Sequence, residues 1–160
     1  MKTNMQMNTS MQGNQYIRLI VMTILSFISM YVLMYAMVNA FENVIPNINQ
    51  FYMAGLMTTP MIIIELVLMW SMYTNKKLNY IILAISSILL IVFFLLIRQQ
   101  TAVSDRQFLK SMIPHHASAI LMCEKANLQD SEIKDLCKAI ISGQQEEINQ
   151  MKAKLKELDK

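Results

Sequence analysis

The amino-acid sequence predicts an all-α protein in which three transmembrane helices precede an extramembrane helical hairpin. Of the 160 residues, 54% are hydrophobic. They gather before residue 100 in three long runs, whereas residues 104–160 are rich in charge and have helical spacing. Each run approaches or exceeds the roughly 20 apolar residues that cross a hydrocarbon core. We expect a short Met-rich cytoplasmic tail over residues 1–16, a membrane anchor over 17–98 and the hairpin over 104–160.

The three apolar runs differ in composition. They are Leu19–Ala40, which has no charge, Tyr52–Tyr73, which contains Pro60 and Glu65, and Tyr80–Ile97, which is uncharged and nearly all aliphatic. The first run is longer than the core of a signal peptide and lacks an Ala-x-Ala cleavage signal, so we expect it to be retained.

The basic residues orient the spans. Lys2 and Arg18 precede the first run, and Lys76 and Lys77 lie between the second and third, whereas the loop Phe41–Phe51 has neither Lys nor Arg. Because positive charge stays in the cytoplasm, we expect a cytoplasmic amino terminus. The hairpin is then periplasmic or external, on a multi-pass protein of the bacterial inner membrane.

The overall charge excludes several kinds of function. The net charge of +3 comes from the membrane half, since the segment from Asp105 onward holds equal numbers of basic and acidic side chains. Such a segment has no electrostatic footprint for nucleic acid, so membrane lipid is the expected partner. The sequence contains no Walker motif, so this chain alone is not expected to be an ATP-driven pump. No nucleophile with a base and an orienting group is visible, so we do not expect an enzyme.

Capping residues delimit the hairpin. Ser104 followed by Gln107 predicts a capping box and a helix that ends near Ala126. After a short turn, Asp130 or Ser131 is expected to cap the second helix.

Residues with soft-metal chemistry share one face of the first hairpin helix. The only two histidines, His115 and His116, are adjacent and follow Met112. A rotation of about 100° per residue places them on one broad face with Met122 and Cys123. Imidazole nitrogen and thioether sulfur together suit copper.

The second helix is expected to bring matching residues to that face. Folding the hairpin about its turn sets Cys123 opposite Cys137 and His116 opposite Gln144, with Met151 near the start of the first helix. Polar and sulfur groups then fall on an apolar seam, where an unpaired polar group is costly.

Simpler interpretations stay open for each of these residues. The methionines are also explained as core residues, and the histidines as core groups bonded to Gln144 or to the carbonyl that Pro114 leaves free. Three interpretations stay open for Cys123 and Cys137: they are small buried hydrophobic residues, they form a disulfide, or they are two soft metal ligands. We favour ligands slightly over the disulfide, because packed helices lie about 8–10 Å apart.

The hairpin resembles a known family in two stretches of sequence. They read Phe108-x-x-x-Met112-Ile-Pro-His-His-x-x-Ala-Ile-x-Met122 and Ile140-Ile-x-x-Gln144-x-x-Glu147-Ile-x-x-Met151. This pattern, over about Asp105–Leu158, resembles domain-of-unknown-function family 305 of bacteria. The resemblance implies a ferritin-like helical fold, periplasmic copper binding and a short membrane-anchored branch of the family.

The resemblance also implies a set of ligands. The copper ligands that it implies are Met112, His115, His116, Met122 and Met151, with Gln144 as a nearby polar partner. The shared helical face adds Cys123 and Cys137 as expected soft ligands. Two helices bury little apolar surface, and a four-helix bundle is the smallest helical unit expected to be stable. We therefore expect a homodimer of hairpins. We expect Cu(I) more than Cu(II), because thioethers prefer the reduced ion.

The membrane half supplies an alternative function. Met57, Met61 and Glu65 recur at helical spacing, and a carboxylate at membrane depth usually faces a bundle interior or a pathway. Copper sequestration, tolerance or handover to a copper-handling partner protein is the expected function. The alternatives are a copper or ion transporter that uses this pathway and a structural membrane subunit without metal.

Overall fold

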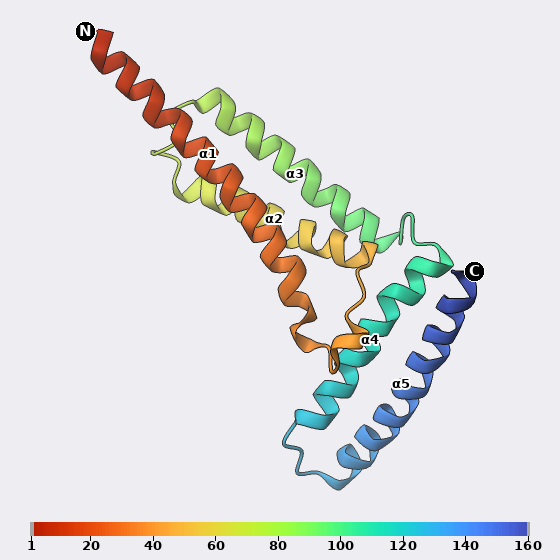
Figure 1. The fold of residues 1–160 in the computed structure, drawn as a ribbon. Helices are drawn as coiled ribbons and strands as arrows, with labels where there is room; N and C mark the ends of the chain where they lie inside the picture. Colours follow the sequence, from red (N-terminus) through yellow and green to blue (C-terminus); the bar gives the residue numbers. More distant parts are fainter. Residues whose placement is uncertain (1, 160) are drawn as a thin grey trace. The chain divides into compact units, whose positions relative to one another are not determined.

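The computed structural model describes residues 2–159, and it describes side chains from Gln15 onward. Within this range the chain is entirely helical, which confirms the predicted all-α class (Figure 1). The helices are α1 (Lys2–Leu33), the 3-10 helices η1 (Met34–Met37) and η2 (Phe41–Asn43), α2 (Ile48–Leu68), α3 (Lys76–Arg98), α4 (Asp105–Lys125) and α5 (Ser131–Leu158).

The chain divides into two compact units. One unit holds the chain up to Tyr31 together with Phe51–Gln99, and the other holds Val32–Gln50 together with the chain from Gln100 onward. The first unit contains most of the membrane anchor, and the second contains the hairpin.

Three helical stretches are long and apolar enough to cross a membrane. They are Gln15–Met37, Ile48–Leu68 and Lys76–Arg98, with mean hydropathies of 2.2, 1.7 and 3.0. The three predicted spans are therefore present. The expected tail is part of a longer element, because α1 already begins at Lys2.

Hydrogen bonds and aromatic packing connect the helices at one end of the membrane unit. Asn79 is fully buried, and its Oδ1 accepts a hydrogen bond of 2.7 Å from the Tyr16 hydroxyl. Its amide donates to the Tyr73 carbonyl at 2.8 Å. Leu19 and Leu66 pack with Tyr73 beside this network. A buried amide with both functions satisfied fixes helix register at little energetic cost.

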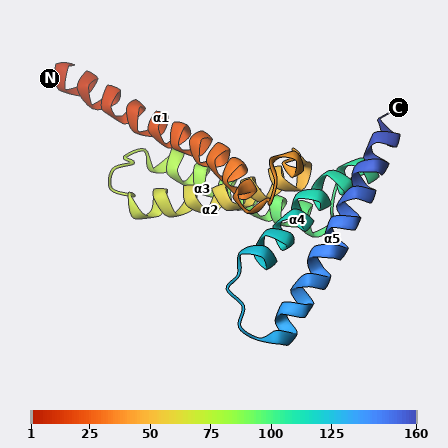
Figure 2. The same cartoon turned by 60° about the horizontal axis from the view of Figure 1, so that its bottom comes forward.

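Side chains cap both hairpin helices at the predicted positions. The Ser104 hydroxyl accepts from the backbone N–H of Gln107 at 3.5 Å, and the Asp130 carboxylate accepts from the backbone N–H of Ile133 at 3.0 Å. The Gln107 side chain accepts from Ile48 instead, so only the Ser104 half of the predicted capping box forms. Asp130 rather than Ser131 is thus the cap of α5. Figures 1 and 2 both show α4 and α5 side by side, joined by a short loop.

The hairpin core has a third contributor that the sequence did not indicate. Ile113, Ile120 and Ile148 are at most 1% exposed, and Val38 and Ile45 from the loop between the first two spans pack against them.

Side chains of α4 also hold the beginning of α2. The side-chain Oδ1 of Asn47 caps α2 by accepting from the backbone N–H of Gln50 at 2.9 Å, and it also accepts from the Ser111 hydroxyl at 3.2 Å. The Gln107 side chain accepts from the Ile48 amide at 3.1 Å. The loop between the first two spans therefore packs against the two hairpin helices. The dimer was expected because two helices by themselves bury little surface, and that reason no longer applies. The dimer itself stays a prediction.

Candidate metal site

His116 is the most enclosed of the candidate ligands. The whole residue is 9% exposed. Its Nδ1–H donates a hydrogen bond of 3.0 Å to the Met112 carbonyl, one turn earlier on α4. Its Nε2 lies 2.6 Å from Oε2 of Glu147 on α5. The ring therefore lies between two hydrogen-bonding oxygens, the Met112 carbonyl and the Glu147 carboxyl.

A cavity of about 230 Å³ opens beside this pair. Its lining residues are Phe108, Met112 and His116 from α4, and Glu147, Gln150 and Met151 from α5. Three of the predicted ligands, namely Met112, His116 and Met151, thus meet in one cavity. Helix α4 supplies one thioether and the imidazole, and α5 supplies the second thioether.

Two other predicted ligands lie outside this cavity. His115 is exposed, and Met122 is 52% exposed. The ring centroids of His115 and His116 are 6.1 Å apart, but the turn of about 100° per residue directs the two side chains differently. Of the two histidines, only His116 lines the cavity.

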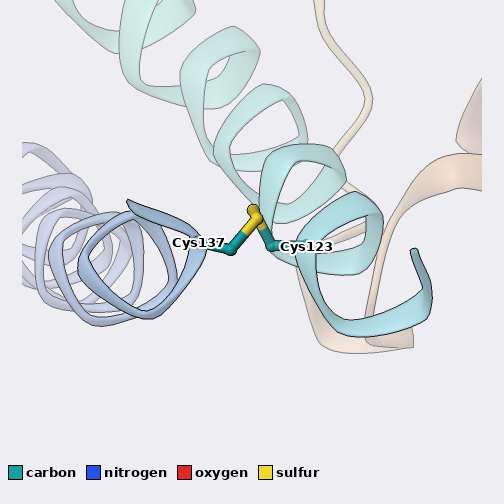
Figure 3. The surroundings of a disulfide bond; sticks show 2 residues. All are labelled: Cys123 and Cys137. Atoms are coloured by element: carbon teal, nitrogen blue, oxygen red, sulfur yellow. A yellow bond between two sulfur atoms is a disulfide. The ribbon is translucent and has the colours of Figure 1, made fainter. Parts of the chain in front are cut away.

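The cysteines form a disulfide, so the preference for two thiol ligands was wrong for this structure. Figure 3 shows the two sulfur atoms bonded between α4 and α5. The Cα atoms of Cys123 and Cys137 are 5.3 Å apart, within the range that a disulfide spans. Because each Cα lies about 2.3 Å from its helix axis, this separation is compatible with the usual interaxial distance of about 8–10 Å. Ordinary helix packing therefore does not prevent the disulfide.

Glu147 takes the place that was expected for Gln144. The Gln144 amide instead donates to Oε2 of Glu147 at 3.5 Å, so it is a partner of the carboxylate. Cys123 and Cys137 meet in the predicted register. At the level of His116, however, the residue opposite on α5 is three positions later than predicted. Glu147 lies one turn beyond Gln144 on the same face. A carboxylate beside the apolar seam of α5, one turn from Gln144 and one turn from Met151, was the signal that sequence reasoning missed.

The donor set of the cavity suits a soft ion. Among the described residues, no group of three or more His, Cys, Asp or Glu side chains gathers. The cavity offers two thioethers, one imidazole and one carboxylate. Thioether and imidazole together fit Cu(I).

The candidates for a membrane pathway have partners of their own. Glu65, in the last turn of α2, receives a side-chain hydrogen bond from Tyr73. The buried hydroxyls of Thr58 and Thr59, one to two turns before Glu65, donate to carbonyls of their own helix. Burial raises the pKa of the Tyr73 phenol, and the nearby Glu65 carboxylate raises it further.

The methionines of this pathway lie at the surface of the membrane unit or near it. Met57 is 42% exposed, and Met61 is partly buried. Met57, Met61 and Glu65 follow one another at intervals of one helical turn.

Comparisons with known proteins extend over both parts of the chain. The family described as a domain of unknown function (DUF305) matches residues 95–155. An uncharacterized protein of Acanthamoeba polyphaga mimivirus is 40% identical over 113 residues, which cover 69% of this chain and 72% of that protein. This stretch is longer than the family match, so the similarity reaches into the membrane half. No solved structure matches the chain.

Proposed function

This chain belongs to the DUF305 family and has three helices able to cross a membrane, and on that basis we propose that it is an integral membrane protein that binds Cu(I). The ion binds in the cavity between α4 and α5, for copper sequestration, tolerance or handover to a copper-handling partner. The observation that carries this proposal is the meeting of Met112, His116 and Met151 in one cavity.

The chemistry of these side chains favours the reduced ion. Thioethers are neutral and need no deprotonation, and two of them with one imidazole make a soft donor set. The hydrogen bond from His116 Nδ1–H to the Met112 carbonyl orients the ring. Nε2 is then the ligand atom, and copper takes the place of its proton and of the bond to Glu147.

The proposal places the hairpin outside the cytoplasm and the Lys76–Lys77 loop inside. The loop Val32–Gln50 and the segment from Gln100 form one unit. Two spans separate them, so a three-span topology puts both on the same side. The disulfide supports an oxidising compartment for that side, since structural disulfides are rare in the cytosol.

Cu(I) titration of the full-length protein in detergent micelles, against a competing chelator, tests this function. Replacing His116 by Ala should weaken binding at least tenfold, or about 1.4 kcal/mol, whereas the matched variant His115→Ala should change it little. Likewise Met112→Leu and Met151→Leu should weaken binding, whereas Met122→Leu should not. Unchanged affinity in the His116 variant would overturn the site.

A homodimer through the hairpin remains part of the proposal. Ile133 and Leu136 on α5 are 48% and 59% exposed, which leaves apolar surface near the loop end of the hairpin. Exposed apolar patches often mark contacts between proteins. The mass of the protein in micelles, compared between wild type and Leu136→Glu, tests this contact.

A further inference from the structure

Glu147 occupies a position in the proposed copper site that a Cu(I) donor set does not explain. Its Oε2 lies 2.6 Å from His116 Nε2, on the wall of the cavity that Met112 and Met151 also line. A carboxylate is a poor ligand for Cu(I), because hard oxygen donors suit harder ions. We propose, building on the proposed copper site, that Glu147 is a ligand for the oxidised ion, so that one cavity binds Cu(I) and Cu(II) through different ligand sets.

The separation of the two atoms fits a shared ion after a small movement. Nitrogen and oxygen ligands lie about 2.0 Å from a transition metal, so two of them at a right angle are about 2.8 Å apart. The observed 2.6 Å is close to this value. The His116 ring is held by its bond to the Met112 carbonyl, so Glu147 is the side that moves.

Glu147 is free to make that movement. Its side chain is 55% exposed, whereas that of His116 is 11% exposed. Its other hydrogen bond, from the Gln144 amide, is long at 3.5 Å. A half-exposed carboxylate rotates toward or away from the cavity at the cost of a few rotamer changes.

The ligand types separate the two oxidation states. His116 Nε2 is common to both sets, Met112 and Met151 complete the set for Cu(I), and Glu147 completes the set for Cu(II). The negative charge of Glu147 also compensates the additional positive charge of Cu(II), which neutral thioethers do not. Glu147 therefore determines whether the cavity accepts Cu(II) in addition to Cu(I).

Glu147→Gln in the full-length protein tests this role, and Glu146→Gln is the matched control. Both variants remove one negative charge, but Glu146 lies outside the cavity lining and contacts Gln150 instead. Affinities for Cu(II), and for Cu(I) kept reduced with ascorbate, are measured at one fixed pH against competing chelators. Electron paramagnetic resonance of the Cu(II) form reports its ligands directly.

We expect Glu147→Gln to weaken Cu(II) binding at least tenfold, to change the resonance spectrum, and to leave Cu(I) affinity within about twofold. Glu146→Gln should change neither affinity. Unchanged Cu(II) affinity in the Glu147 variant would overturn the proposal. Equal weakening of both ions would also overturn it, because Glu147 would then only orient His116. If the wild-type protein bound Cu(II) through Glu147 but did not bind Cu(I), the proposed function and the binding of both ions would fail, while the assignment of Glu147 as a Cu(II) ligand held.

Discussion

Loss of the disulfide should destabilise the hairpin without weakening copper binding. The bond between Cys123 and Cys137 joins residues 14 positions apart and closes a loop of about that length. Removing such a constraint on the unfolded chain costs about 3 kcal/mol by the loop-entropy estimate. The double variant Cys123→Ser/Cys137→Ser should therefore open its hairpin more often, by roughly two orders of magnitude.

Hydrogen–deuterium exchange of the full-length protein in micelles measures this opening. The slow amides near Ile120 and Ile148, in the hairpin core, should exchange on the order of 100-fold faster in the double variant. The amides of α3 are the internal control, because they belong to the other unit. Unchanged protection near Ile148 would refute the loop-entropy reasoning. A large loss of Cu(I) affinity in the double variant, with its hairpin still folded, would restore the cysteines to the ligand set.

Three further predictions follow from single features of the chain. In a thermal melting assay, Gly55→Ala should lower the stability of the protein, because a Cβ at residue 55 would lie 2.5 Å from the Phe93 ring. Gly143→Ala should stabilise α5 by up to about 1 kcal/mol in the same assay, because a Cβ at residue 143 would meet no atom outside its own stretch of helix within 4 Å. Acidification should weaken Cu(I) binding in a chelator competition, since a proton competes with the ion for His116 Nε2, and a flat profile would exclude imidazole as a ligand. The Lys76–Lys77 loop should be labelled only from the cytoplasmic side, and a reporter fused after the last residue should be active only outside; the reverse pattern would contradict the proposed topology.

The sequence by itself determined the elements of this protein. The three spans were predictable because a run of apolar side chains either is or is not long enough to cross the hydrocarbon core. The limits of α4 and α5 were predictable because capping by Ser104 and Asp130 involves backbone amides only three residues away. The meeting of Cys123 with Cys137 followed from folding the hairpin about its turn. All of these properties depend on neighbouring residues or on simple length.

Only the tertiary structure decided the composition of the site. It placed Glu147, not Gln144, against His116, left His115 and Met122 outside the cavity, and joined the cysteines in a disulfide. It also covered the hairpin core with Val38 from a loop far away in sequence. These outcomes depend on the rotation of each helix about its axis and on the register between helices, where a shift of one turn exchanges one facing residue for another. Such quantities are set by side-chain packing between segments distant in the chain, and no local pattern contains them.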